Sequence, residues 1–191
     1  TCTNNSGTGN GSGYGIYVSG DSTLSFNTCT SNNGQGENSS GIGIRVHEGS
    51  TITNNTCTYN RGSYSSGSGS TGAGIVVTGA GNTISHNNCD ANTGNGLQSS
   101  AGIRITGNGN RIENNSLTRH SGGIGSYGLS VSGTRNHLLS NTFQGNTTNS
   151  IYISGSNNYY AANIHPAAES ISDGGTGNVN GTMPGSNVAV P

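Results

Sequence analysis

Residues 41–60 read GIGIRVHEGSTITNNTCTYN, and this stretch contains every part of a repeat that runs along most of the chain. It opens with a Gly-Ile-x-Val unit, continues through the isolated apolar residue Ile52, and closes with Asn55 and Cys57. The opening unit recurs about every 28 residues, a spacing typical of stacked structural repeats. Its copies, the last with Ser in place of Gly, are residues 15–18, 43–46, 74–77, 102–105, 128–131 and 150–153.

Two more columns keep a fixed register with each other. In successive copies an apolar residue is followed three positions later by an asparagine, and a small or apolar residue comes two positions after that asparagine. The asparagines are Asn27, Asn55, Asn87, Asn115 and Asn141. The residues that follow them are Cys29, Cys57, Cys89, Leu117 and Phe143, and Cys2 extends this column toward the N-terminus. We therefore expect three short strands per coil, stacked from coil to coil about 4.8 Å apart.

The pattern predicts an all-β fold, a three-sided parallel β-helix (solenoid) of about six coils. Alternate side chains of a strand face opposite ways, so we expect Ile16 and Val18 to face the interior and Tyr17 to face solvent. The asparagine column falls in the short turn between the second and third strands, where stacked amides can bond from coil to coil. Chain length varies only after the third strand, which predicts variable loops along one flank.

The Gly-Ile-x-Val strand, the short asparagine turn and the single variable turn resemble the pectate-lyase-like right-handed parallel β-helix superfamily. The resemblance covers residues 1–163, and residues 164–191 are expected to form an irregular C-terminal tail or cap. Right-handedness is implied by the resemblance alone. Function stays open, because the superfamily includes lyases, hydrolases, epimerases, phage tailspikes, adhesins and structural spacers.

Composition excludes several classes of partner. The chain is 7% charged and 27% hydrophobic, and its formal net charge is −1. Disorder usually accompanies high net charge, so a repeat fold with few core residues per coil explains these values better. No basic cluster indicates nucleic-acid binding, and no apolar run reaches the ~20 residues that membrane insertion requires. The polar, lysine-free composition indicates an extracellular or cell-surface location. The start at Thr1, without Met or signal peptide, indicates a processed mature chain or a fragment.

The four cysteines allow two interpretations. Cys2, Cys29, Cys57 and Cys89 occupy one inward column, where they can serve as small buried hydrophobic residues. Alternatively, neighbours pair as disulfides, Cys2 with Cys29 and Cys57 with Cys89, because adjacent Cα atoms lie within disulfide range. No C-x-x-C motif is present and a linear stack cannot supply tetrahedral ligands, so we expect no metal site and no cofactor.

The resemblance places catalytic residues of the superfamily on the outer face of the first strand. No acidic residue occupies that face here, and only Asp21 and Glu48 come close to each other, at the ends of neighbouring first strands. The Asp pair and Gly-His-Gly of the hydrolases and the Asp-Pro-His-Glu of the epimerases are absent. A lyase could use Arg45 or Arg104 as base, but the acid cluster for calcium is missing. We therefore predict no catalytic residue.

The outer face does carry side chains that suit sugars or anions, because aromatic rings stack on sugars and guanidinium groups bind anionic groups. The predicted ligand-binding residues are Tyr17, Arg45, His47, Arg104 and Tyr152. The alternative is a set of solvated strand residues with no ligand.

Three functions remain at this point. The first is a secreted or cell-surface structural or adhesive β-solenoid that assembles end to end with itself into filaments. The second is a polysaccharide-binding or polysaccharide-degrading β-helix of the lyase, hydrolase or phage-tailspike type. The third is ice binding through outward threonine columns that flank the cysteines, such as Thr28 and Thr30 or Thr56 and Thr58.

Overall fold

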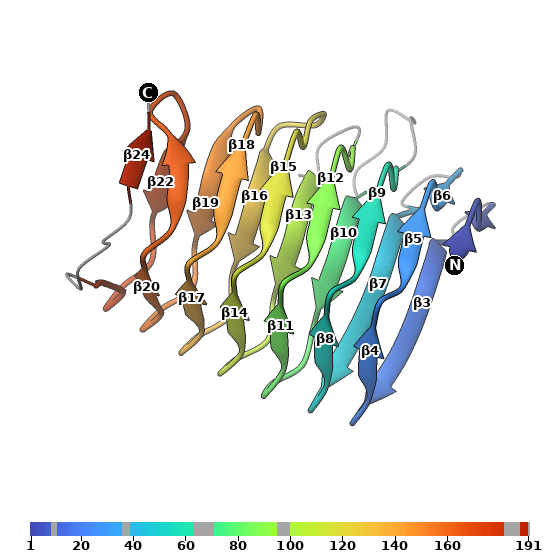
Figure 1. Cartoon of the computed structure of the whole chain (residues 1–191), viewed down its shortest axis with the longest axis horizontal. Coiled ribbons are helices and arrows are strands. Elements are labelled where there is room, and N and C mark those ends of the chain that lie inside the picture. Colours follow the sequence, from blue (N-terminus) through green and yellow to red (C-terminus); the bar gives the residue numbers. More distant parts are fainter. Residues whose placement is uncertain (9–10, 36–38, 63–70, 95–99, 182–187, 191) are drawn as a thin grey trace.

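The computed structural model is a parallel β-solenoid with three long sheets, and the residues that it describes form no helix (Figure 1). It describes residues 1–8, 11–35, 39–62, 71–94, 100–181 and 188–190. Each coil contributes one strand to each sheet, and every pair of neighbouring strands in a sheet is parallel and comes from successive coils. The predicted fold class is therefore confirmed. No helix in the described segments is long and apolar enough to cross a membrane.

The first sheet is built from the Gly-Ile-x-Val strands. Its members are β3 (Gly13–Gly20), β7 (Gly41–Glu48), β10 (Gly72–Val77), β13 (Ser100–Ile105), β16 (Ser126–Val131), β19 (Asn149–Ile153) and β22 (Ser170–Asp173). The second sheet comprises β4 (Thr23–Ser25), β8 (Thr51–Thr53), β11 (Thr83–Ser85), β14 (Arg111–Glu113), β17 (His137–Leu139), β20 (Tyr159–Ala161) and β23 (Val179–Asn180).

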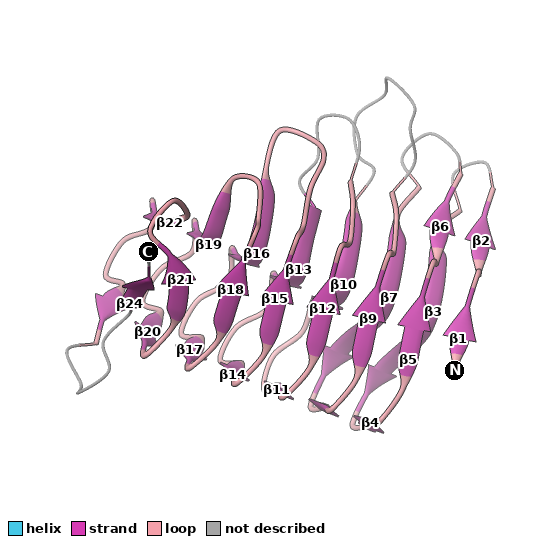
Figure 2. Ribbon diagram, turned by 45° about the horizontal axis from the view of Figure 1, so that its top comes forward, coloured by secondary structure: helices cyan, strands magenta, loops and turns pink. Residues whose placement is uncertain are grey.

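The third sheet carries the cysteine column, and Figure 2 shows it on the side that faces the viewer. It contains β1 (Cys2–Thr3), β5 (Thr28–Thr30), β9 (Thr56–Thr58), β12 (Asn88–Asp90), β15 (Ser116–Thr118), β18 (Thr142–Gln144), β21 (Ile164–Pro166) and β24 (Val188–Val190). A short pair, β2 (Ser6–Gly7) and β6 (Asn33–Gly34), follows the first two strands of this sheet. The segments of variable length come next, and in the first four coils their central residues, 9–10, 36–38, 63–70 and 95–99, lie outside the described part of the chain.

The segment that starts at residue 164 differs from the sequence prediction. An irregular tail or cap was expected there, but β21, β22, β23 and β24 continue all three sheets. Ile171 stacks beneath Ile151 and packs against the core. This last coil is hidden in the sequence because its first strand reads Ser-Ile-Ser-Asp, without the glycine and the second apolar residue. Parallel pairing needs only backbone groups, so the sheets extend without them.

The core is a single stack of aliphatic columns inside the three sheets. Ile44, Ile75, Ile103, Leu129 and Ile151 lie in register and are fully buried. Cys29, Cys57 and Cys89 form a second buried column, which Leu117 continues in the next coil. As expected, Ile16 and Val18 pack against this core, while Tyr17 is 53% exposed. All four cysteines are free thiols, which agrees with their interpretation as small buried hydrophobic residues.

All three corners of the solenoid use the same two-residue turn. A residue in the left-handed region is followed by a residue whose side chain turns inward, usually asparagine. At the second corner, between the second and third sheets, Asn54 has φ +55° and Asn55 is buried. The left-handed position is often glycine or asparagine, but it also holds Phe26, Tyr59 and Arg119. Such residues are strained there, so the ladders that follow must hold the corner.

The predicted asparagine column forms a continuous hydrogen-bonded ladder. Each Oδ1 accepts both the backbone N–H and the Nδ2–H of the asparagine one coil before it, as Asn87 Oδ1 does from Asn55 at 2.9 and 3.0 Å. Each Nδ2 also donates to a strand carbonyl, for example Asn87 Nδ2 to Ile52 O at 2.9 Å. The ladder begins at Asn27 and runs to Asn163, one coil beyond the predicted column.

Two further ladders were not predicted from the sequence. At the first corner, between the first and second sheets, the ladder residues are Ser22, Ser50, Asn82, Asn110, Asn136, Asn158 and Asn178. At the third corner, after the third sheet, they are Asn5, Asn32, Asn60, Asn92, His120, Asn146 and Glu169. The signal was present: these positions come two before the second-strand apolar residue and three after the cysteine column.

The third ladder explains the glycine that opens the repeat. A Cβ on Gly15 would lie 2.9 Å from Asn32 Nδ2, and one on Gly102 would lie 2.4 Å from His120 Nε2. In these coils the first strand therefore approaches the ladder residue too closely for a side chain. In the sixth coil Ser150 takes this place, and its hydroxyl donates to the Glu169 carboxylate at 2.8 Å.

Candidate functional site

The outer face of the first sheet brings the predicted ligand-binding residues together. Pairing between strands places one row of outward side chains in register along the solenoid axis. The row is Tyr17, Arg45, Val76, Arg104, Ser130 and Tyr152. His47 lies two residues beyond Arg45, in the next outward row. The row from Tyr17 to Tyr152 spans five strand spacings, about 24 Å.

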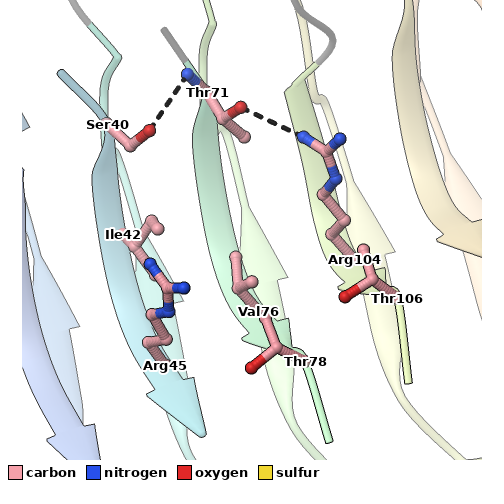
Figure 3. Close-up of a pocket in the computed structure, with 8 residues that line it drawn as sticks. All are labelled: Ser40, Ile42, Arg45, Thr71, Val76, Thr78, Arg104 and Thr106. Atoms are coloured by element: carbon pink, nitrogen blue, oxygen red, sulfur yellow. Dashed lines mark hydrogen bonds between the residues drawn. The ribbon is translucent and has the colours of Figure 1, made fainter. Parts of the chain in front are cut away.

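A hollow of about 190 Å³ lies across β7, β10 and β13 in the middle of this face (Figure 3). Its lining residues are Ser40, Ile42, Arg45, Thr71, Val76, Thr78, Arg104 and Thr106. Ile42 and Val76 are 4% and 6% exposed, and with Ala73 they form an apolar cluster separate from the interior core. The hollow therefore combines an apolar patch with two guanidinium groups and several hydroxyls.

Arg45 is held by the tyrosine in the preceding coil. Its Nη1 donates to the Tyr14 hydroxyl at 2.9 Å, and its guanidinium carbon lies 5.7 Å from the centre of the Tyr14 ring. Its Nε is buried and has no hydrogen-bond partner in the described structure. A cation–π contact and one hydrogen bond thus orient this side chain, and part of its donor capacity stays available to a ligand.

Arg104 is oriented in the same sense, because its Nη1 donates to Thr71 Oγ1 in the preceding coil at 3.1 Å. Burial lowers the pKa of the Arg104 guanidinium, although an arginine remains charged in proteins. Neither Arg45 nor Arg104 pairs with a carboxylate among the described residues. The ion pairs described there join Arg111 to Glu113 and Arg119 to Asp90, on other faces. The two hollow arginines are therefore available to an external anion.

Tyr17 and His47 lie together at the N-terminal end of the row. His47 Nε2 is 3.1 Å from the Tyr17 hydroxyl, and its Nδ1 is 3.1 Å from Thr78 Oγ1 at the edge of the hollow. This chain of hydrogen bonds connects three successive coils and fixes the orientation of an exposed aromatic ring. Tyr17 also contacts Tyr14, with ring centres 5.9 Å apart.

Tyr152 lies at the other end of the row and stacks on Tyr127. The two rings are nearly parallel, with centroids 4.8 Å apart and planes 12° apart. Burial raises the pKa of the Tyr127 phenol. Tyr127, Tyr14 and Val76 were not among the residues chosen from the sequence. Alternation counted from Tyr17 and Ser130 would turn Tyr14 and Tyr127 inward, because each stands three residues before the outward row. Only the contacts of these tyrosines with Arg45 and Tyr152 show that they face outward.

No described carboxylate lines the hollow. Asp90 accepts from Arg119 Nε at 2.8 Å, and Glu169 ends the third ladder. Asp21 and Glu48 lie at the first corner, where Asp21 N–H donates to Glu48 O at 3.0 Å, and neither lines the hollow. Glu37 falls outside the described residues. No group of three or more potential metal ligands occurs in the described segments.

The threonine columns occupy the first coils of the third sheet. Thr3, Thr30 and Thr58 are in register, as are Thr28 and Thr56, and Thr58 Oγ1 donates to Thr30 Oγ1 at 3.1 Å. In the fourth coil the equivalent positions are Asn88 and Asp90, so the array ends after three coils.

A family model described as "Right handed beta helix region" matches residues 1–165. Searches of curated proteins and of solved structures gave no match. The matched region covers the six repeat units, the hollow and all of the ladder residues except Glu169 and Asn178. The chain therefore belongs to the right-handed β-helix family.

Proposed function

We propose that this chain is a non-catalytic, polysaccharide-binding β-helix that acts as an adhesive body outside the cell or at its surface. The single observation that carries the proposal is the hollow between Arg45 and Arg104, with its apolar patch at Ile42 and Val76. Its volume of about 190 Å³ suits one sugar ring of a longer chain that continues over the flanking tyrosines.

A sugar has an apolar side and a polar rim, and the outer face of the first sheet offers a complementary partner for each. A pyranose ring has an apolar C–H side, which can pack on Val76 and on tyrosine rings, and hydroxyls at its rim. The hydroxyls of Ser40, Thr71, Thr78 and Thr106 surround the hollow and can exchange hydrogen bonds with them. A few polar groups around an apolar floor are typical of small-molecule and cofactor sites.

Charge favours an acidic polysaccharide over a neutral one. The whole chain has a formal net charge of −1, yet Arg45 and Arg104 create a local positive site without a described acidic neighbour. Guanidinium groups bind carboxylate and sulfate through paired, charge-assisted hydrogen bonds. Partial burial strengthens these bonds, because less solvent screens them.

Binding without cleavage is favoured by what surrounds the hollow. Hydrolysis of a glycosidic bond usually requires two carboxyl groups about 5 to 9.5 Å apart across the substrate. No described residue lining the hollow is acidic. The two arginines remain protonated, so they suit charge recognition better than proton abstraction.

The test is a glycan array probed with the purified chain and with the double variant Arg45→Ala/Arg104→Ala. We expect the native chain to bind acidic glycans, and the double variant to lose that binding. Arg135→Ala is the matched control, because it removes one exposed arginine on the first corner and no hollow contact. Equal binding by the double variant, with its melting temperature unchanged, would refute the proposal.

End-to-end assembly and ice binding remain separate proposals from the sequence. Electron microscopy over a range of concentrations tests the first, since filaments would support it and discrete particles would contradict it. An ice-recrystallisation assay tests the second. Inhibition of recrystallisation by the native chain that is lost in the double variant Thr30→Val/Thr58→Val would support ice binding, and no inhibition would contradict it.

A further inference from the structure

The cysteine column of the third sheet stacks thiols at the spacing of neighbouring strands. Cys2, Cys29, Cys57 and Cys89 pair in register from β1 to β12, and all four are free. Neighbouring strands lie about 4.8 Å apart and side chains stand roughly perpendicular to a sheet, so successive sulfurs lie one above another along the solenoid axis. The thiols also influence one another, since a hydrogen bond with Cys57, together with burial, raises the pKa of the Cys29 thiol.

This spacing is much longer than a disulfide bond and suits one metal ion between two sulfurs. A disulfide bond is about 2.0 Å long, so both side chains would have to rotate toward each other to form one. A thiolate–metal bond is about 2.3 Å long, so two such bonds in line span about 4.6 Å and need almost no movement. A tetrahedral ion such as Zn²⁺ does not fit, because the sulfurs lie on one line.

We propose that the cysteine column binds a soft monovalent ion that takes two ligands in line, Cu(I) or its analogue Ag(I), between two successive thiols. Thiolate sulfur is a soft ligand and favours such ions over harder ones. Each thiol serves one ion, because the two bonds of a bridging sulfur would have to leave it in opposite directions, and sulfur favours bonds nearer to right angles. The site lies inside the solenoid and is independent of the function proposed for the outer face.

Binding leaves the interior uncharged. One ion and two thiols form one metal–thiolate bond and one metal–thiol bond and release one proton, so the thiolate balances the charge of the ion. An unbalanced buried charge would be costly, and this complex has none. Cys29, Cys57 and Cys89 are fully buried in one core cluster with aliphatic side chains such as Ile44 and Ile75, which exclude water from the ion.

The extent of the column limits where the ion can bind. Leu117 and Phe143 continue the column in the next two coils without a sulfur, so metal binding is confined to the coils from β1 to β12. Because Cys29, Cys57 and Cys89 are 0% exposed, the ion enters while the coils assemble rather than through the walls of the folded solenoid.

The test loads the full chain with Ag(I), which does not oxidise thiols. The chain is refolded from urea in the presence of Ag(I), and excess glutathione then removes weakly held ions. Native mass spectrometry counts the ions per chain, and X-ray absorption identifies their ligands. We expect the native chain to retain at least one ion, bound by two sulfurs and by no nitrogen or oxygen ligand.

Two double variants with the same number of thiols test the importance of register. Cys2→Ala/Cys89→Ala keeps Cys29 and Cys57, which are neighbours, whereas Cys2→Ala/Cys57→Ala keeps Cys29 and Cys89, which lie two coils apart. Two neighbouring thiols bind as a chelate, whereas a single thiol has no advantage over glutathione. We therefore expect the variant with separated thiols to hold Ag(I) about a hundredfold more weakly and to retain no ion.

Circular dichroism establishes that each variant folds. If Cys2→Ala/Cys57→Ala does not fold, Cys29→Ala/Cys89→Ala replaces it, because it keeps Cys2 and Cys57, which also lie two coils apart. Equal retention of Ag(I) by neighbouring and separated thiols, or no retained ion in the native chain, would overturn the proposal.

Discussion

Replacement of Asn87 by alanine tests whether the ladders hold the solenoid together. Asn87 is 1% exposed. Its Oδ1 accepts from Asn55 N and Nδ2 at 2.9 and 3.0 Å, and its Nδ2 donates to Ile52 O and Asn115 Oδ1 at 2.9 and 3.0 Å. Alanine removes these four bonds and leaves their partners buried. At a net value near 0.5 to 1.5 kcal/mol per bond, the expected loss in free energy of unfolding is about 2 to 6 kcal/mol.

The neighbouring asparagine provides the control. Asn88 is exposed on the outer face of β12, and its backbone N–H bonds to Asn55 O independently of its side chain. We expect Asn88→Ala to change the free energy of unfolding by less than about 0.5 kcal/mol. Urea denaturation followed by circular dichroism measures both variants, and hydrogen exchange at the Asn55 amide locates the effect. If Asn87→Ala were as mild as Asn88→Ala, the ladder would not be the stabilising element inferred here.

The remaining predictions concern the third corner and the core columns. Burial lowers the pKa of His120 to about 4 from an ordinary value near 6.5. As pH falls, the unfolded chain therefore takes up the proton before the folded chain does. The free energy of unfolding should fall by about 3 kcal/mol as pH drops from about 6.5 to about 4. His120→Asn, which restores the asparagine of the ladder, should remove that part of the pH dependence in urea titrations, and an unchanged profile would contradict the assignment. Gly128→Ala would place a Cβ 2.3 Å from Phe143 Cδ1 and is expected to destabilise the chain by about 1 to 3 kcal/mol. The loss of stability should be smaller when Phe143→Leu is added, because the ring is then absent. An equal loss in the double variant would refute the steric cause. Cys29, Cys57 and Cys89 are fully buried thiols, so they should react with a thiol reagent only after denaturation, whereas a native chain with disulfides would yield fewer than four thiols when unfolded.

Parts of the site could be found from sequence because they depend on strand alternation. Once the Gly-Ile-x-Val units were aligned, Tyr17, Arg45, Arg104 and Tyr152 fell on one outward row, and the structure keeps them there. Their partners could not be found in this way. Contacts such as Arg45 with Tyr14 and Tyr127 with Tyr152 depend on which rotamer leans toward which coil.

One of the three ladders could be predicted from the sequence, and two could not. The second-corner ladder was predicted because its asparagines stand at constant offsets from two apolar columns. The ladders through Asn82 and Asn92 were missed, because asparagine is so frequent in this chain that two more columns do not stand out. The substitution of His120 and Glu169 into the third ladder further obscured it.

The sequence by itself determined the parallel solenoid, its register and the inward or outward direction of the residues that follow the repeat glycine. These properties follow from the alternation of inward and outward residues within each strand and from a repeat that places similar residues above one another. Both patterns can be recognised in short stretches of the sequence. Only the tertiary structure decided that the sheets continue past residue 163, that three ladders hold the three corners, and that two arginines frame an apolar hollow. Each of these depends on contacts between coils some 20 to 35 residues apart, where distance and orientation, rather than residue type, decide which groups meet.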